Sequence, residues 1–480
     1  MTNPSTPKPD VKHPAYDEMY GVWKDCRAAK TGQRAVHKEG EAYLPRLSGQ
    51  TDQDYKAYLL RATYFNATGR TVEGMEGLVF RKKPMVVMPD SMKPWAQDIS
   101  RGGHSLEGFA RTCVGEVITT ARGGILVDHP NQKPRADGSV PTVAEVAKSG
   151  ARPYFAYYTA ENIYNWEQRR VDNVFKTVNI WLAEPVNDIE DVPSQIRQLS
   201  LDSGVYTQIL WTRTKRQWTA SEPITPLMNG KALTDIPFWF LAPKEPDCNI
   251  QDPPIEDLAI VNLSHFRNSA DLENGAHVAG QPTPYVTGLE GGTDEKGDPL
   301  NVLTIGSNTA WILPDVNSKV GFLQCGQEGF ASLEKLMDRK ENQMAALGAR
   351  LIAPEKKAAE TAETAGIRRG GENSVLSSIA RSVSMQIEKA WKFAAEWAGI
   401  PADKVTFSLN LDFLPTTLDA QMLTALVGAW QAGAMSDEAF FDALQQGEIF
   451  DESVTFEDEK SRREADGPKL GVIGTEDDPE

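Results

Sequence analysis

The fold is decided by two stretches, IEDLAIVNLSHFRNSADLENGAHV at residues 255–278 and GFASLEKLMDRKENQMAALGARLIA at residues 329–353. Both favour helix, and Pro253-Pro254 stops the preceding chain and can open the first helix. At about 1.5 Å per residue, the first helix would span roughly 36 Å. Residues 281–324 between them are rich in Pro and Gly and contain strand-like runs. The order predicts two long helices joined through a small β insert.

The second stretch also carries a narrow apolar stripe. Its members alternate in spacing between three and four residues, with one polar member: Phe330, Leu333, Met337, Lys340, Met344, Leu347 and Leu351. Such a heptad seam suits packing against neighbouring long helices better than covering a broad core. Periodicity alone leaves an ordinary core-facing helix open as the alternative.

The insert is too small to hold a core by itself, because roughly 45 residues usually need support from elsewhere. Its β-forming residues are Tyr285, Val286, Val302, Leu303, Ile305, Trp311, Ile312 and Leu313. Neighbouring copies could supply that support, and we expect Tyr285, Trp311 and Ile312 at a contact between subunits. Two long helices joined through a small β insert are what a subunit needs to line a tube and present a docking platform at one end. The pattern therefore indicates a ring-forming conduit rather than an enzyme.

Length, charge and cysteine content limit the possible domain number, partners and location. A chain of 480 residues is expected to form two to four domains or lobes. Its net charge of −17 disfavours tight DNA binding by the whole surface, because carboxylates repel phosphates. The four cysteines are far apart and predict free thiols in a reducing compartment. No secretion signal or apolar run of about 18 residues is recognisable, so we expect a cytoplasmic protein when made, with no membrane contact.

The remaining chain reads as helices, then strands, then helices. Helices are expected at residues 16–38, 52–63, 71–80, 105–122 and 376–397, and short ones at 416–433 and 436–447. Ser105 caps one start, and Gly123-Gly124 is expected to end that helix. Residues 152–240 favour strands, with a turn at 188–191, and another strand is expected at 405–411. The polar, acidic last twenty or so residues are expected to fray.

Motifs of common enzymes are missing from the sequence. It contains no phosphate-binding GxxxxGK[ST] loop, no GxGxxG after a strand, no HExxH and no zinc-ligand spacing. Asp128-His129 lies at a strand end without an identifiable nucleophile. The loop carboxylates Asp188, Glu190 and Asp191 leave a metal-dependent hydrolase or nuclease as an alternative, and a capsid or adaptor subunit is another. We expect no enzyme activity, no cofactor and no metal.

Five segments, in order, resemble the portal (head-to-tail connector) proteins of tailed bacteriophages. They cover residues 41–84 (EAYLPRLSGQ…RKKP), 123–130 (GGILVDHP), 160–170 (AENIYNWEQRR), 253–288 (PPIEDLAIVN…YVTG) and 368–399 (RRGGENSVLS…EWAG). The resemblance implies an α+β portal fold with a wing, a two-helix stem, a β-containing clip, a tunnel loop and a helical crown. In chain order these are a flexible arm (1–13), wing (14–252), stem (253–278), clip (279–328), stem (329–353), tunnel loop (354–373), wing (374–414), crown (415–466) and acidic tail (467–480).

The same resemblance implies a function. Portal subunits form a ring, usually a dodecamer, at the unique capsid vertex, and double-stranded DNA is packaged and ejected through its channel. Implied partners are the terminase large subunit, head-tail adaptor proteins and the major capsid protein or scaffold. The implied locations are the host bacterial cytoplasm during assembly and the virion vertex. Four basic residues flank the tunnel loop and are expected to touch the DNA backbone: Lys356, Lys357, Arg368 and Arg369.

Overall fold

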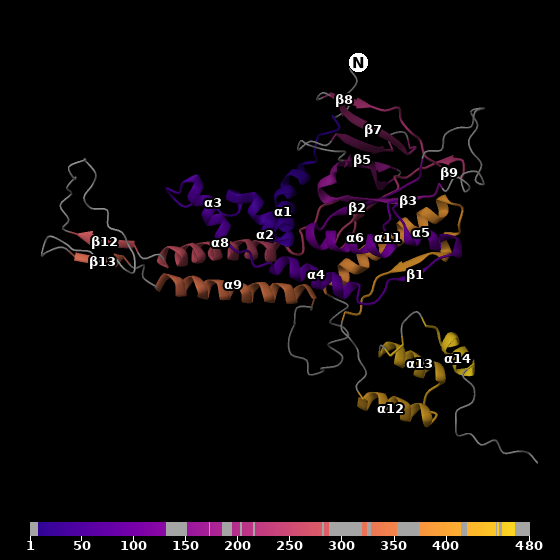
Figure 1. Ribbon diagram of the computed structural model, residues 1–480. Helices are drawn as coiled ribbons and strands as arrows, with labels where there is room; N and C mark the ends of the chain where they lie inside the picture. Colours follow the sequence, from indigo (N-terminus) through magenta and orange to yellow (C-terminus); the bar gives the residue numbers. More distant parts are fainter. Residues whose placement is uncertain are drawn as a thin grey trace, which may run out of the picture. The chain divides into compact units, whose positions relative to one another are not determined.

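The computed structural model describes residues 8–130, 151–171, 173–184, 194–201, 204–214, 217–280, 283–287, 319–323, 328–352, 374–413, 420–447, 449–450 and 454–465. The chain divides into two compact units, Met1–Leu411 and Asp412–Glu480. The architecture is mixed α+β (Figure 1). The turn expected at residues 188–191 lies outside the described residues.

The first unit opens with a group of helices: α1 (Pro14–Thr31), α2 (Gln33–Glu39), η1 (Gly40–Ala42), α3 (Asp52–Arg61) and α4 (Ala67–Val79). The single helix expected over residues 16–38 was wrong. Gly32 adopts φ 92° between α1 and α2, a backbone conformation that glycine reaches at little cost. The apolar spacing continues across the break, which is why periodicity did not reveal it.

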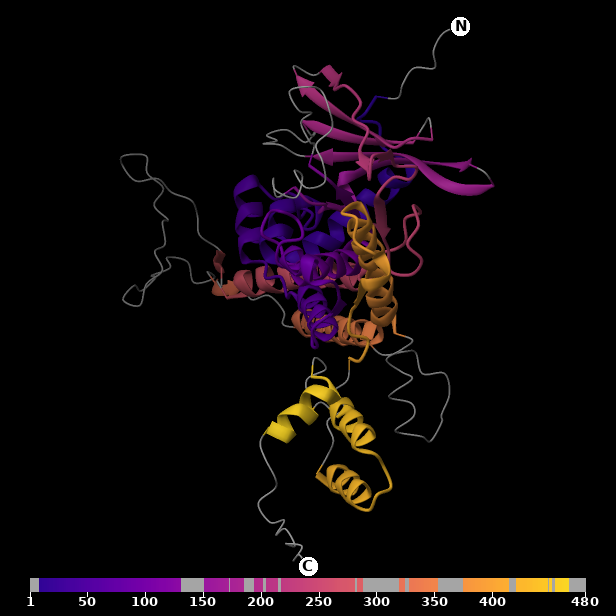
Figure 2. The same ribbon diagram turned by 90° about the vertical axis from the view of Figure 1, so that its right-hand side faces the viewer.

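Two antiparallel sheets follow. Strands β4 (Ile163–Val171), β5 (Val174–Glu184), β6 (Gln195–Ser200), β7 (Thr207–Thr214) and β8 (Gln217–Ala220) form a five-stranded meander in that order. β11 (Phe238–Leu241), β2 (Gly123–Asp128) and β3 (Tyr154–Thr159) form a three-stranded sheet with β2 in the middle. The β4–β5 hairpin extends beyond the residues that pair with β6, as a two-stranded ribbon (Figure 2). Short elements complete this part: β1 (Met85–Val87), η2 (Asp90–Met92), α5 (Lys93–Gln97), η3 (Ala160–Asn162), β9 (Leu227–Met228) and β10 (Lys231–Ala232).

Helices α6 (Leu106–Thr120) and α11 (Val375–Trp397) pack on each other, and both pack on β2. Ser105 caps α6 as expected, since its side chain accepts a hydrogen bond from the Gly108 N–H. Gly123-Gly124 does not end α6. Ala121 ends it in a left-handed conformation, and both glycines lie in β2. A Cβ on Gly124 would meet the Phe238 ring at 2.0 Å, so this position needs glycine for close packing between strands.

The end of α11 leads through η4 (Ala402–Lys404) to the strand β14 (Thr406–Ser408). β14 is shorter than the strand expected at residues 405–411, and among the described strands its partner is β1. Trp391 on α11 is fully buried and makes edge-to-face contacts with Trp95 and Phe155. This aromatic contact ties α11 to β3 and to the helix α5.

Helices α8 (Glu256–Ala279) and α9 (Glu328–Ile352) lie side by side (Figure 1). Their bounds differ by one residue from the predicted ranges. The chain between them contains the antiparallel strands β12 (Thr283–Thr287) and β13 (Lys319–Leu323), which pair over five residues each. The predicted order of helix, β insert and helix is therefore present.

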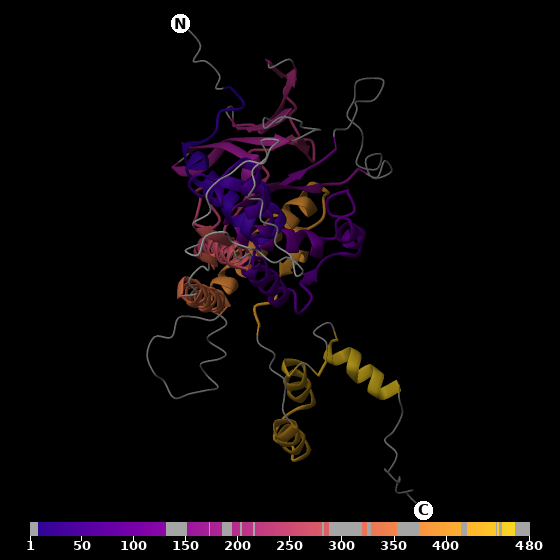
Figure 3. The ribbon, with the colours of Figure 1, turned by 60° about the vertical axis from the view of Figure 1, so that its left-hand side comes forward.

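The second unit, described by itself, contains α12 (Ala420–Gln431), α13 (Asp437–Gln446) and α14 (Phe456–Ala465), drawn in gold in Figure 3. Ser436 caps α13, accepting from the Ala439 N–H. The helix α14 stands in the polar C-terminal part, where composition alone predicted fraying. Asp458 and Thr455 bond reciprocally at its start, and this capping box stabilises a helix of polar residues.

Candidate functional site

The paired helices α8 and α9 are the strongest candidate for a functional site. On α9 the heptad residues Phe330, Leu333, Met337 and Leu347 are partly buried, and Met344 is 3% exposed. Most residues between these positions are exposed, including Glu334, Lys335, Asp338, Arg339, Asn342 and Gln343. A narrow stripe of α9 therefore packs within the chain, and most of its circumference remains exposed.

The polar member of the stripe, Lys340, reaches across to α8. Its Nζ donates to the Ser264 carbonyl at 3.0 Å and to the Ser264 Oγ at 2.8 Å, and it also contacts Asn268 Oδ1. Burial lowers the pKa of Lys340, and the nearby Arg267 adds to the effect. A polar residue in an otherwise apolar seam restricts the register of two helices, so this contact fixes how α9 aligns with α8.

A second polar pair lies beside it. The buried His265 of α8 is 3.3 Å from a carboxylate oxygen of Glu341 on α9. Burial lowers the pKa of His265, and the hydrogen bond to Glu341 opposes that shift. The ring also lies 5.8 Å from the Phe65 ring, so His265 connects α9 with the segment before α4.

Asn262 anchors the first half of α8 to the N-terminal helices. It is fully buried, and its Oδ1 accepts from Tyr64 Oη at 2.8 Å, the Thr68 N–H at 3.0 Å and Thr68 Oγ1 at 2.8 Å. Its Nδ2 donates to the Phe65 carbonyl at 2.7 Å. The turn between α3 and α4 is therefore fastened to α8 through a single amide.

Further contacts extend this attachment along α8. Tyr58 Oη donates to Asp271 at 2.6 Å, and Arg61 donates to Asn274 at 3.0 Å. Beneath them lies a buried cluster formed by residues of α1, α2, α3 and α8 and of the segments that follow η1 and α3: Ala28, Val36, Tyr43, Leu44, Tyr55, Tyr58, Ala62, Tyr64, Leu263, Phe266 and Ala270. One side of α8 thus belongs to the core of the first unit, and another side receives α9.

At the far end of the pair, α8 and α9 touch through a glycine. A Cβ added to Gly275 would lie 2.5 Å from Phe330 Cε1, so the Phe330 ring occupies the space that a side chain would need. We expect Gly275→Val to lower the free energy of unfolding by about 1–3 kcal/mol, the usual cost of overpacking. Urea denaturation followed by tryptophan fluorescence measures this.

Gly329→Val is the matched control, because no atom lies within 4 Å of a Cβ at Gly329. It should change stability by less than about 0.5 kcal/mol. Equal losses in the two variants would contradict the assigned contact.

The β insert is described only at its base. Tyr285 lies opposite Gly321 and is 45% exposed. The other two residues expected at a subunit contact, Trp311 and Ile312, lie outside the described residues. The same is true of the four basic residues expected to touch DNA: Lys356, Lys357, Arg368 and Arg369. The seam residues share one side of α9, and Tyr285 lies in β12, beyond the end of the pair where Phe330 meets Gly275.

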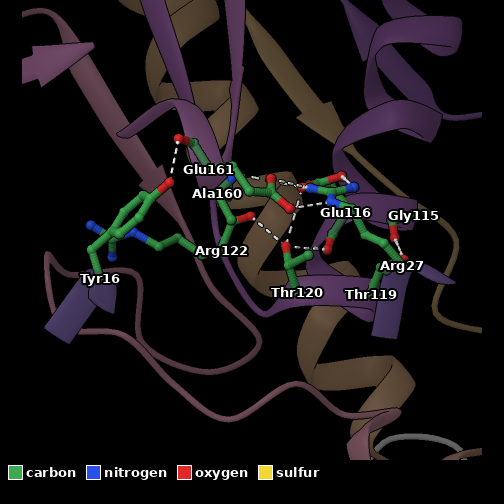
Figure 4. A network of polar contacts seen from close by, with 9 residues as sticks. All are labelled: Tyr16, Arg27, Gly115, Glu116, Thr119, Thr120, Arg122, Ala160 and Glu161. Carbon is green, nitrogen blue, oxygen red and sulfur yellow. Dashed lines mark hydrogen bonds and ion pairs between the residues drawn. The ribbon is translucent and has the colours of Figure 1, made fainter. Parts of the chain in front are cut away.

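A half-buried polar network away from the helix pair joins α1, α6 and η3 (Figure 4). Arg27 of α1 binds two carboxylates, Glu116 of α6 and Glu161 of η3, with Nη1 3.0 Å from Glu116 Oε2 and Nη2 2.6 Å from Glu161 Oε2. Burial alone would lower the pKa of Arg27, but the hydrogen bonds to Glu161 and Glu116 outweigh it and raise the pKa. Sequence reasoning missed this network, because its members are far apart along the chain.

Asp128, considered above with His129 as a catalytic pair, belongs to another internal network. It accepts hydrogen bonds from Tyr154 Oη at 3.1 Å and Gln208 Nε2 at 3.0 Å, and Arg197 lies 3.7 Å away. His129 lies near the Trp397 ring, and burial lowers the pKa of its imidazole. These contacts give Asp128 and His129 structural roles inside the fold.

Within the described ranges, no group of three or more His, Cys, Asp or Glu side chains is arranged to hold a metal ion. Over the same part of the chain, none of the helices has both the length and the apolar character needed to cross a lipid bilayer. The carboxylates at positions 188, 190 and 191 fall outside these ranges.

Comparisons with known proteins find one family model and similar chains among solved structures. A family model described as a domain of unknown function (DUF4055) matches residues 254–398. No curated protein matches the chain. Solved structures with similar chains include the virion of a native gene transfer agent (GTA) particle, with TM-score 0.41, 11% identity, and coverage of 87% of this chain and 99% of that one.

A chain from the neck of the native GTA particle, computed with C12 symmetry, gives TM-score 0.39, 12% identity, and coverage of 85% and 98%. One from the neck of the empty particle, computed with C6 symmetry, gives TM-score 0.38, 10% identity, and coverage of 86% and 98%. The residues matched by the family model include the α8–α9 pair and α11.

Proposed function

We propose that this chain is a portal subunit, which forms a ring around a channel for double-stranded DNA. The observation that carries the proposal is the α8–α9 pair, anchored to the body along α8, exposed over most of α9 and joined at one end through the β12–β13 hairpin. Repeating such a pair around an axis makes a tube wall. The five sequence segments that resemble bacteriophage portals support the same function.

In this proposal, α8 and α9 are the stem, and the segment between them is the clip. The wing comprises the first unit up to α8 together with α11 and β14, and α12–α14 form the crown. Residues 354–373 are the tunnel loop. The ring, of about twelve copies, would occupy the capsid vertex and receive the terminase large subunit, then head-tail adaptors. The major capsid protein or scaffold would surround it.

The charge of the chain suits a channel through which DNA slides. Each phosphate that a protein neutralises adds salt-dependent affinity, and tight contacts would resist movement. The described helix α8 carries four carboxylates and one arginine, and α9 carries as many acidic as basic residues. A channel wall made of these helices would bind DNA phosphates weakly. Contacts between basic side chains and the DNA backbone would then be confined to the tunnel loop.

The tunnel-loop assignment has its own test. We expect the variant with Lys356, Lys357, Arg368 and Arg369 all changed to Ala to form intact rings but to package DNA more slowly or incompletely. Basic side chains at the constriction would contact the backbone without sequence preference. Packaged genome length in assembled particles measures the effect, and normal packaging by this variant would remove the loop from the DNA path.

The ring itself is tested by negative-stain electron microscopy of the purified full-length protein. We expect ring-shaped particles with a central hole. A protein that stays monomeric under every assembly condition, or that forms closed particles without an axial opening, would overturn the proposed function. DNA cleavage dependent on a divalent metal would instead support a nuclease.

A further inference from the structure

The chain just before α1 is attached to an edge strand of the five-stranded sheet. β4 comes first in the order β4-β5-β6-β7-β8, so it forms one edge of the described sheet. The His13 N–H donates to the Tyr164 carbonyl at 2.9 Å, and Asn165 Nδ2 donates to the Val11 carbonyl at 3.0 Å. Both partners lie near the start of β4. Residues 8–13 thus form an N-terminal strap that is fastened to this strand.

The imidazole of His13 holds the strap to both β4 and α1. It stacks on the Trp166 ring of β4, with centroids 4.0 Å apart and planes inclined by 16°. Its Nδ1 accepts a hydrogen bond from the Ala15 N–H at 3.2 Å, which makes His13 the N-cap of α1. Accepting this bond needs a lone pair on Nδ1, so the ring must be neutral, with its proton on Nε2. The docked strap therefore requires an uncharged His13.

A proton on Nδ1 would meet unfavourable surroundings. The new N–H would face the Ala15 N–H, and its positive charge would lie at the N-terminus of α1, where the helix dipole is already positive. The Arg122 guanidinium also lies 4.1 Å from the centroid of the Trp166 ring on which His13 stacks. Burial and the charge of Arg122, in that order, lower the pKa of His13.

The cations near His13 keep their charge when the pH falls. Burial lowers the pKa of Arg122 to about 9, which still leaves the guanidinium charged at neutral and acidic pH. Lys12 Nζ lies 4.6 Å from the centroid of the Tyr16 ring and 5.2 Å from that of the Tyr164 ring. A protonated His13 would therefore be a third positive charge among these aromatic rings.

Carboxylates on the neighbouring elements do not offset these cations. Asp10 belongs to the strap itself, and Asp17 in the first turn of α1 is exposed. Glu161 of η3 and Glu167 of β4 are each already bound by an arginine. Burial and the nearby guanidinium set the direction of the pKa shift of His13, so the docked strap disfavours the protonated ring.

We propose that the strap is acid-sensitive: protonation of His13 releases residues 8–13 from β4 and loosens the first turn of α1. That turn depends on His13, whose carbonyl accepts from the Tyr16 N–H at 2.9 Å while its ring accepts from the Ala15 N–H. Release would uncover the buried Tyr16 and Trp166. The inference is independent of the proposed ring, because all of its contacts lie within one chain.

The direction of the pH effect follows from the pKa of His13. The ordinary pKa of an imidazole is 6.5 and the docked ring has a lower pKa, so the released strap binds a proton more readily than the docked strap. Docking is therefore fully favoured above about pH 6.5 and weakens as the pH falls below that value. Each pKa unit between the two states weakens docking by about tenfold once the pH is below both pKa values.

Hydrogen–deuterium exchange of the full-length protein, read by mass spectrometry, tests the proposal. Labelling at about pH 7.5 and about pH 5 brackets the ordinary pKa of histidine, with labelling times scaled to equalise intrinsic exchange. We expect the peptide covering residues 8–20 to lose protection several-fold at the lower pH and the peptide covering α6 to keep its protection. Unchanged protection of residues 8–20 would overturn the proposal. Equal losses in both peptides would show general unfolding and would also overturn it.

Two variants connect the response to one ring. His13→Asn does not titrate, and asparagine can still accept a backbone N–H as an N-cap, so its peptide should be equally protected at both pH values. His104→Asn is the matched control, because His104 is exposed and its Nδ1 lies 3.0 Å from Ser100 Oγ. It should keep the wild-type response. An acid-induced loss in His13→Asn as large as in the wild type would mean that another group titrates, and the strap would not be controlled by His13.

Discussion

Changing Arg27 to Leu is expected to lower the free energy of unfolding by about 2–4 kcal/mol, somewhat less than breaking a fully buried ion pair, because a third of the Arg27 side chain is exposed. Arg27 is the cation between Glu116 and Glu161, and the Glu116 side chain is only 9% exposed. Without the guanidinium, Glu116 would remain as a buried charge with no cation beside it. Urea denaturation followed by tryptophan fluorescence measures the loss.

Two control variants separate this cause from general disruption. The double variant Arg27→Leu with Glu116→Leu should be less damaging than Arg27→Leu alone, because no uncompensated charge remains buried. Arg70→Leu removes an exposed ion pair to Glu73 and should cost at most about 1 kcal/mol. If Arg27→Leu costs no more than Arg70→Leu, the network does not hold α1, α6 and η3 together.

Asn262→Leu is expected to have the second large effect, a loss of about 3–5 kcal/mol. Leucine is similar in size to asparagine, but it cannot bond to Tyr64, Thr68 or the Phe65 carbonyl, and each buried group left unpaired costs about 1–3 kcal/mol. The same urea experiment measures the loss of stability. Because Asn262 fastens α8 to the body, we also expect fewer closed rings in electron micrographs.

Asn342→Leu is the control for this variant. Asn342 lies on the exposed side of α9 and donates only to the Asp338 carbonyl one turn earlier. Its replacement should change monomer stability by less than about 0.5 kcal/mol. A similar small change for Asn262→Leu would mean that the amide is not the anchor of α8.

The long helices were predictable because local signals agree with their tertiary role. Pro253-Pro254 marks the start of the first, the heptad stripe runs the length of the second, and the observed bounds of α8 and α9 differ by one residue from those predicted. The break at Gly32 was not predictable in the same way. Its glycine interrupts an apolar pattern that continues on both sides, and only the turn geometry distinguishes one helix from two.

Side-chain networks were beyond sequence reasoning for a different reason. Arg27 and Glu116 are 89 positions apart, and Asn262 is 194 positions from Thr68. No local pattern links such pairs, and each residue taken alone looks like an ordinary polar residue of a helix. Lys340 was visible as the polar member of an apolar stripe, but its acceptors on α8 depend on the register between two helices, which periodicity does not specify.

The paired strands β12 and β13 between the two rods have a mechanical consequence. Strands β12 and β13 are joined by five facing residue pairs, and each strand continues toward a different rod, α8 or α9. A lengthwise slide of one rod past the other that exceeded the reach of the few residues between strands and rods would shear the two strands and break their ladder of backbone hydrogen bonds. We therefore expect the paired strands to restrict lengthwise sliding of α8 and α9, so that a load on the strands would be passed along α8 to the body.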